Sequence, residues 1–268
     1  MLSRTELIEP LLDIDMNYHR CANNRQTNNA RRRLTILLVA RFRIIAPILV
    51  QKIYGISKAK SLEHLNSLVV AGFLTLVKTV RSPDSRVYVL TFSGAAYAEE
   101  LMGIHVPFRS QSNPALQFNA NSVVHDMILM HCCMLKEKEE SFWEGFITEI
   151  EFKRIYPANE IRNVDALVKK DGEIIAIEIE GSHKQKRNHE TNLIKFCYSL
   201  KLGIYQKVFF ISPLERVLAD TKRFHTELLD ELPLRKNPLI SIKDASLLKN
   251  SLIYRTKFCN KLQNLFYP

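Results

Sequence analysis

The apolar positions in the first part of the chain follow helical spacing and then change to strand alternation. Leu62, Leu65 and Leu68 recur at three-residue steps, which is typical of one buried helix face. Ser57 can cap this helix and Gly72 ends it. The predicted elements are helices over 34–43 and 47–55, the helix from Ser57 to Gly72, strands over 74–80 and 86–92, and a helix that ends near 102.

The second part of the chain predicts an α/β order. Residues 103–121 are rich in Ser, Asn, Pro and Gln without a sustained period, so we interpret them as a linker. Asp171-Gly172 separates two alternating runs, which is a strong hairpin signal. The predicted elements are a helix over 122–140, a strand over 146–157, a hairpin over 162–181, a helix over 186–203 and a strand over 207–212.

Four regions follow from these patterns. Residues 1–102 form the first predicted domain together with an N-terminal extension, and 103–121 form the linker. Residues 122–230 form the second predicted domain. The C-terminal extension, 231–268, is dotted with Lys and Arg and is amphipathic enough to pack on the core or to bind a partner.

Composition and charge narrow the class of protein. The 268 residues are 46% hydrophobic and 25% charged, as in ordinary globular proteins. The five cysteines form no C-x-x-C pair, which argues against a disulfide framework and a zinc site and favours the cytoplasm. We expect no export signal and no membrane insertion. The net charge is +10, and residues 1–60 hold 11 Lys/Arg against 4 Asp/Glu, a local excess of +7 that favours polyanions.

The first domain resembles winged helix-turn-helix domains over about 70 residues. The resemblance lies in Ser57-Lys58-Ala59-Lys60-Ser61, in the following AGFLTLVKT, in the hairpin and in LTFSGAAYAEE. It implies that the third helix enters the major groove of DNA while the hairpin tip touches the backbone or the minor groove. The DNA-binding residues that it implies are Lys58, Lys60, Ser61 and His64 on the helix and Lys78, Arg81 and Arg86 on the wing. The alternative is a winged helix that serves protein contact or dimerisation.

Three carboxylates are expected to converge in the second domain. Glu178 and Glu180 are two apart on a strand, so they point to the same face. A hairpin turning at 171–172 places Asp165 opposite Glu178. Carboxylates grouped in this way suit a hard divalent cation such as Mg²⁺ or Mn²⁺. The alternative is the exposed face of an edge strand.

The element order and these acids resemble the PD-(D/E)xK nuclease superfamily, whose core is αβββαβ. The resemblance covers about 122–212 and implies that Asp165, Glu178 and Glu180 are metal ligands and catalytic residues. Two departures stand out: Asn163-Val164 replaces the usual proline, and Glu180 replaces the usual lysine. Lys184 or Lys186 can take the role of that lysine; the alternative is that this basic loop after the strand contacts phosphate. The resemblance also implies a further acidic residue from the first helix, for which His125 and Asp126 are the candidates. The alternative candidates are Glu149 and Glu151 on the first strand.

The combination of a winged-helix-like domain with a nuclease-like core resembles the plasmid mobilisation relaxases of the MOBC class and the replication-relaxation family. The residues that carry it are His125, Val164-Asp165-Ala166, Ile177-Glu178-Ile179-Glu180, Lys195 and Tyr198. The resemblance implies a bacterial cytoplasmic enzyme that nicks double-stranded plasmid DNA at a transfer origin with Mg²⁺ or Mn²⁺. It also implies an accessory mobilisation protein and a type IV coupling protein as partners, with a homo-oligomer as a further expectation.

Three alternatives to metal-dependent nicking stay open at this point. A covalent intermediate on Tyr198 or Tyr254 is one. The second is a non-catalytic DNA-binding replication or regulatory protein with a degenerate nuclease fold, which the glutamate at the lysine position favours. The third is a defence or transposon endonuclease that cuts both strands.

Overall fold

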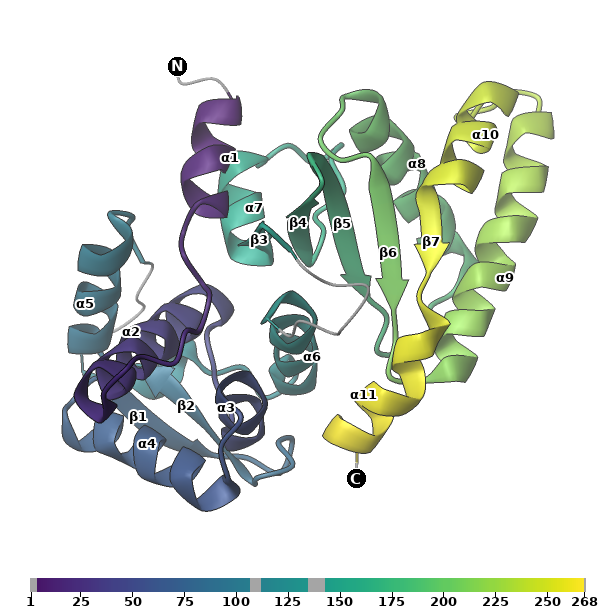
Figure 1. The fold of residues 1–268 in the computed structure, drawn as a ribbon. Helices are drawn as coiled ribbons and strands as arrows, with labels where there is room; N and C mark the ends of the chain where they lie inside the picture. The colour runs from purple at the N-terminus through teal and green to yellow at the C-terminus, as the bar shows by residue number, and fades with distance from the viewer. Residues whose placement is uncertain (1–3, 107–111, 135–142, 268) are drawn as a thin grey trace. The chain divides into compact units, whose positions relative to one another are not determined.

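The computed structural model describes residues 4–106, 112–134 and 143–267, which divide into two compact units. Residues 14–106 and 112–134 form what we call the helix–hairpin unit, and residues 4–13 together with 143–267 form the sheet unit. The described residues make a mixed α/β protein with one two-stranded and one five-stranded sheet (Figure 1). The coarse fold class is therefore as predicted.

The helix–hairpin unit begins with three helices whose ends have local causes. Asn23 accepts a hydrogen bond from the Gln26 N–H at the start of the first helix, and Gly55 ends the second at φ 62°. Ser57 accepts a hydrogen bond from the Lys60 N–H at the start of the third. The helices are α2 (Asn24–Phe42), α3 (Pro47–Tyr54) and α4 (Lys58–Val70).

A β-hairpin follows these helices and packs on α4. Strands β1 (Leu74–Lys78) and β2 (Arg86–Leu90) pair antiparallel with Lys78 opposite Arg86, and α5 (Phe92–Met102) comes next. The buried Tyr88 of β2 donates its hydroxyl hydrogen bond to Asn66 of α4 at 3.0 Å. The predicted order of three helices, a hairpin and a helix is confirmed.

Helix α6 (Val123–Met134) also belongs to the helix–hairpin unit, where it packs on α2 and α3. The sequence predicted a helix over 122–140 as the start of the second domain; residues 135–140 of it lie outside the described residues. Nine of its twelve residues are buried. Such a helix has no distinct polar face, so its periodicity does not say which unit covers it. Before it, the predicted linker contains the short helix η1 (Pro114–Gln117).

The sheet unit contains a mixed sheet in the order β3-β4-β5-β6-β7. Strands β3 to β5 pair antiparallel, whereas β6 pairs parallel to both β5 and β7. The strands are β3 (Gly145–Thr148), β4 (Ala166–Lys170), β5 (Glu173–Ile179), β6 (Lys207–Ile211) and β7 (Leu252–Tyr254). The last strand comes from the predicted C-terminal extension, which therefore contributes to the sheet.

Helices connect and flank this sheet. The crossover from β5 to β6 is α8 (Lys186–Lys201), and α9 (Glu215–Glu231) with α10 (Ile242–Ser251) leads to β7. Helices α8, α9 and α10 pack on one another beside β6 and β7 (Figure 1). The remaining elements are η2 (Leu232–Leu234), η3 (Thr256–Phe258) and α11 (Cys259–Phe266).

Helix α1 (Arg4–Leu12) packs on β3 and α7 (Glu149–Ile155) of the sheet unit, although the sequence placed it with the first domain. A Cβ atom at Gly145 would lie 2.1 Å from the Leu12 carbonyl oxygen. Only glycine allows this close approach between the two backbones. The helix is thus seated on the sheet at a specific point.

The hairpin between β4 and β5 matches its prediction. Asp171 and Gly172 have φ values of 51° and 77°, as a type I′ turn requires, and Lys170 lies opposite Glu173. The predicted strand over 146–157 is wrong after Thr148, where α7 begins. Thr148 and Glu151 form a capping box, in which the Glu151 carboxylate accepts the Thr148 N–H hydrogen bond at 2.8 Å.

Candidate functional site

The three predicted carboxylates lie at the adjacent ends of β4 and β5. Asp165 directly precedes β4; its N–H donates to the Ile177 carbonyl at 3.1 Å, and its carboxylate accepts the Ile179 N–H hydrogen bond at 2.7 Å. Since Ala166 pairs with Ile177, the same register puts Asp165 opposite Glu178. The strand positions that were expected to bring the acids together are therefore confirmed.

Glu178 is buried, with 1% of its surface exposed. One carboxylate oxygen accepts a hydrogen bond from the Arg162 guanidinium at 2.7 Å, and the other has no hydrogen-bond partner among the described residues. Burial raises the pKa of Glu178 to about 8; Arg162 opposes this shift, and the charges of Asp165 and Glu180 add to it. The carboxyl group therefore holds its proton more tightly than an ordinary glutamate.

Glu180 follows β5 directly and is equally buried, at 2% exposure. Lys184, four residues further on, places its ammonium group 2.7 Å from a Glu180 carboxylate oxygen. Burial raises the pKa of Glu180, and Lys184 counteracts this shift. We call Asp165, Glu178, Glu180, Arg162 and Lys184 the carboxylate cluster.

The alternative of an exposed, solubilising strand face does not fit these two glutamates. Charged side chains are rarely buried without a partner or a ligand, and here each buried acid has one cation. In the parts of the chain that the structure describes, no group of three or more His, Cys, Asp or Glu is arranged to hold a metal ion. The Glu178 oxygen without a partner is nevertheless a free acceptor that fits a hard cation.

The other candidate residues lie on other helices. His125 and Asp126 are on α6 in the helix–hairpin unit, where the Asp126 carboxylate contacts Arg43 at 3.4 Å and accepts a hydrogen bond from Ser122 at 3.0 Å. Lys186 forms ion pairs with two glutamates of α9 instead of with the cluster. The expectation that Lys186 could replace the usual catalytic lysine is therefore wrong for this structure.

Glu149 and Glu151 were alternative acids on the first strand, and this placement is wrong. Both lie in the first turn of α7, where negative charge is stabilised by the helix dipole. Glu151 completes the capping box, and Glu149 forms an ion pair with Lys153. Their carboxylates thus serve the helix.

A hydrogen-bonded chain of buried side chains was missed by the sequence reasoning. The His189 and His225 rings are 3.1 Å apart between Nδ1 and Nε2, and His225 Nδ1 lies 2.7 Å from the Tyr254 hydroxyl. Burial lowers the pKa of His225 to about 3 and of His189 to about 4, so both rings are neutral near pH 7. The histidines lie on different helices, and nothing in their spacing predicts this contact.

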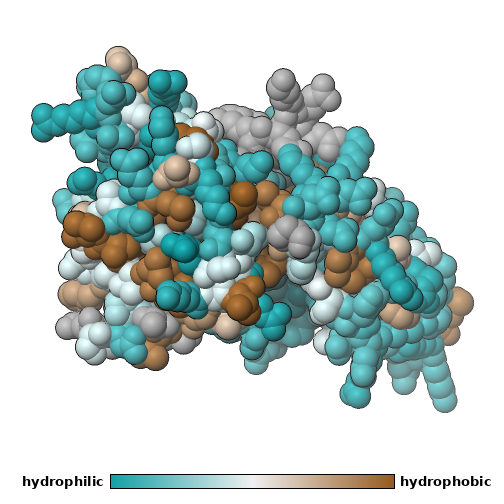
Figure 2. Space-filling model, turned by 90° about the horizontal axis from the view of Figure 1, so that it is seen from below, coloured by the Kyte–Doolittle hydropathy of each residue, from teal (hydrophilic) through white to brown (hydrophobic). Residues whose placement is uncertain are grey.

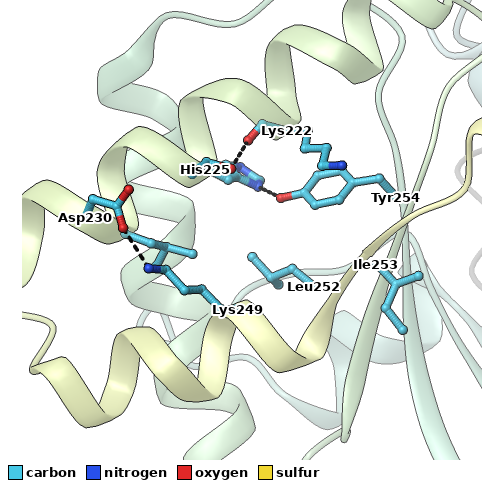
Figure 3. Close-up of a pocket in the computed structure, with 9 residues that line it drawn as sticks. Lys222, His225, Asp230, Lys249, Leu252, Ile253 and Tyr254 are labelled. Atoms are coloured by element: carbon cyan, nitrogen blue, oxygen red, sulfur yellow. Dashed lines mark hydrogen bonds and ion pairs between the residues drawn. The ribbon is translucent and has the colours of Figure 1, made fainter.

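His225 and Tyr254 form part of the wall of a cavity of about 540 Å³ between α9, the end of α10 and β7 (Figure 3). Its rim carries Lys222 and an ion pair between Lys249 and Asp230 at 2.6 Å. Burial raises the pKa of Tyr254, and the charge of Glu180 acts in the same direction. A phenol that is difficult to deprotonate is a poor nucleophile, which argues against a covalent role for Tyr254.

The DNA-binding residues expected on α4 divide into exposed and buried ones. Lys58 and Lys60 are exposed. Ser61 is fully buried and donates its hydroxyl hydrogen bond to the Lys58 carbonyl at 2.7 Å, so its expected DNA contact is wrong. His64 lies 2.9 Å from the Thr35 hydroxyl, and burial lowers its pKa to about 4, so it offers no positive charge near neutral pH.

The three residues expected on the wing lie at or beside the hairpin loop. Lys78 and Arg81 are exposed, while Arg86 is half-buried and donates a hydrogen bond to the Asp84 carbonyl at 3.4 Å. Asp84 also forms an ion pair with Lys58 of α4 at 3.3 Å. The helix and the loop are thereby joined.

Comparison with protein-family models, curated proteins and solved structures found no match. None of the described helices combines the length and apolar character that a membrane crossing needs. The face in Figure 2 is mainly hydrophilic, with hydrophobic groups in separate small patches, as is usual for protein surfaces.

Proposed function

We propose that the protein is a DNA strand-nicking enzyme that uses Mg²⁺ or Mn²⁺ and acts at a plasmid transfer origin, as a relaxase of the replication-relaxation type. The observation that carries the proposal is the burial of Glu178 and Glu180 at the end of a central strand, with Asp165 opposite. This is the position that the likeness to PD-(D/E)xK nucleases implies for the catalytic acids. Buried ion pairs contribute little net stability, and buried acids with raised pKa values cluster at functional sites.

The cluster supplies ligands for the ion. Asp165, Glu178 and Glu180 would hold it, and Glu178 has a carboxylate oxygen without a hydrogen-bond partner in the described chain. When bound, such an ion polarises the scissile phosphate and lowers the pKa of water. The pKa of Glu180 is raised by burial, which brings this carboxylate closer to the range in which a general base is effective.

The two cations of the cluster have a role toward the substrate. Arg162 and Lys184 neutralise the acids in the structure described here. Guanidinium and ammonium groups both form hydrogen bonds to phosphate oxygens. We expect Arg162 and Lys184 to contact the DNA backbone in this way, and Lys184 thereby to take the role of the lysine that the sequence replaces with Glu180.

DNA recognition would come from the helix–hairpin unit. Its three helices and hairpin follow the winged-helix order. Four exposed cations lie on α4 and at the hairpin, namely Lys58, Lys60, Lys78 and Arg81. The expected partners are the transfer-origin duplex, an accessory mobilisation protein and a type IV coupling protein. These partners rest on the resemblance alone.

The test uses supercoiled plasmids with and without a candidate transfer origin, in Mg²⁺, Mn²⁺ or EDTA. Asp165→Asn and Glu178→Gln keep the shape of the side chains but replace a carboxylate ligand of the ion with a neutral amide, so nicking should fall by at least about a hundredfold. Glu173→Gln is the matched control because Glu173 lies on the same strand but pairs with Lys207 at the surface. Its nicking rate should equal that of the wild type.

The other outcomes distinguish the alternatives. Linear product without dependence on the origin would favour a defence or transposon endonuclease. DNA binding without cleavage in any metal would favour a non-catalytic replication or regulatory protein, a function consistent with the two cations that already neutralise the cluster. Activity that survives both substitutions would place the chemistry at other residues.

A further inference from the structure

A polar groove lies between the start of α2 and α4 of the helix–hairpin unit. Its cavity volume is about 540 Å³. The residues that matter for its chemistry are Asn24, Asn28, Arg31 and Arg32 of α2 and Lys60 and His64 of α4. Most of them were not among the residues expected to contact DNA. We call this feature the α2–α4 groove.

The groove is positively charged. Arg31, Arg32 and Lys60 face it against the single acid Glu63, and His64 is neutral near pH 7 because burial lowers its pKa to about 4. Neither Arg32 nor Lys60 forms an ion pair with any residue that the structure describes. Their charges are therefore available to an anion from outside.

Arg31 forms a fixed wall of the groove. Its Nε donates a hydrogen bond to the Tyr18 hydroxyl at 3.1 Å, and its guanidinium lies over the Tyr18 and Tyr54 rings at 5.6 and 5.8 Å. Cation–π contacts of this kind hold the group in place while leaving other N–H donors free. A charge held in place by its own unit needs little reordering when a ligand binds.

The groove lies on the side of α4 that faces away from the hairpin. Lys60, His64 and Ser67 are spaced four and three residues apart, so they share one face of α4, which lines the groove. The opposite face contacts the hairpin, through Lys58 to Asp84 and through Asn66 to Tyr88. Between these faces α4 is open to solvent, as the 89% exposure of Val70 indicates.

Cations therefore flank the exposed face of α4 on both sides. Lys78 and Arg81 lie at the hairpin loop on one side, and Arg32 and Lys60 lie at the α2–α4 groove on the other. A helix in the major groove of duplex DNA has a phosphate backbone on each side. The two cationic flanks match that arrangement in sign and in number.

We propose that the α2–α4 groove binds the phosphodiester backbone of duplex DNA on the side of α4 opposite to the hairpin. Arg32 and Lys60 contact phosphate oxygens, while Arg31 and the neutral His64 line the groove beside them. The inference rests on the proposed DNA-binding function and adds the second backbone contact to it. It does not depend on metal or on cleavage.

The test measures binding of a labelled duplex to the full-length protein in EDTA by fluorescence anisotropy, over a series of salt concentrations. Arg32→Ala should weaken binding about tenfold and reduce the slope of log affinity against log salt by about 1. Arg33→Ala is the matched control, because Arg33 is the next residue on α2 and is also exposed but does not line the groove. It should change the affinity by less than about twofold.

Two further variants sharpen the result. Lys60→Ala should resemble Arg32→Ala, and the effects of Arg32→Ala and Arg81→Ala should multiply, since the two flanks bind separate strands. Equal losses for Arg32→Ala and Arg33→Ala would overturn the proposal in favour of diffuse charge. Wild-type-like binding by Arg32→Ala would overturn only the proposal that the α2–α4 groove binds the DNA backbone. Absence of DNA binding by the wild-type protein would overturn the proposed DNA-binding function as a whole.

Discussion

Glu178→Gln should make the protein more resistant to alkaline pH, because the buried carboxylate destabilises the folded state when it loses its proton. Burial raises its pKa to about 8 in spite of Arg162, against about 4.3 in an unfolded chain. Between these values the folded protein holds one more proton than the unfolded protein, so the free energy of unfolding falls as pH rises. The slope is about 1.4 kcal/mol per pH unit, or about 2 kcal/mol between about pH 6.5 and pH 8.

Urea unfolding of the full-length protein in EDTA measures this slope. Trp143, the only tryptophan, lies in the sheet unit and reports its unfolding by fluorescence. The glutamine amide keeps an oxygen that can accept the Arg162 hydrogen bond, so Glu178→Gln removes the titration without removing that partner. Glu173→Gln, at a glutamate whose side chain is 44% exposed, should keep the wild-type slope.

The pH range separates Glu178 from other titrating groups. His189 and His225 have pKa values lowered to about 4 and 3, so they make the protein more stable as pH rises, and this effect is complete near the unfolded pKa of about 6.5. Glu180 also has a raised pKa and leaves a residual slope in both proteins. An unchanged slope in Glu178→Gln would refute the reasoning.

Three further predictions concern the sheet unit, α4 and the metal. Gly145→Ala should destabilise the sheet unit by at least about 2 kcal/mol in urea, because its Cβ would lie 2.1 Å from the Leu12 carbonyl oxygen; wild-type stability would contradict the seating of α1. Ser57→Ala should lower the free energy of unfolding by about 1 kcal/mol through loss of the α4 cap, whereas Ser57→Asp should restore it. Mn²⁺ should raise the melting temperature of the wild type but not that of Glu178→Gln, and equal shifts would place the ion elsewhere.

Local signals in the sequence predicted part of the site. The Asp171-Gly172 turn fixes the register of its hairpin because both residues adopt positive φ, and that register brings Asp165 opposite Glu178. Counting residues from the turn was therefore enough to place these acids. The ion pair between Glu180 and Lys184 was not predictable in this way, since the two residues are four apart in a loop and not on a helix.

Contacts between distant segments could not be predicted in the same way. Arg162 reaches Glu178 across the strands, and His189 meets His225 across two helices. Helical periodicity shows that α6 is buried but does not say by which elements. The strand that ends at Thr148 gives way to α7 because of a capping box, a signal that the alternation of Glu149 and Glu151 concealed.

The placement of α1 has a consequence for how the protein is made. Helix α1 belongs to the sheet unit, whose first strand begins only at Gly145, so the helix–hairpin unit is inserted between two parts of the sheet unit. During synthesis from the N-terminus, α1 is made before the β3 and α7 segments on which it packs, and the inserted unit can complete its fold in the meantime. The chain also passes from one unit to the other twice, so a single proteolytic cut at one of these crossings leaves the two units covalently connected.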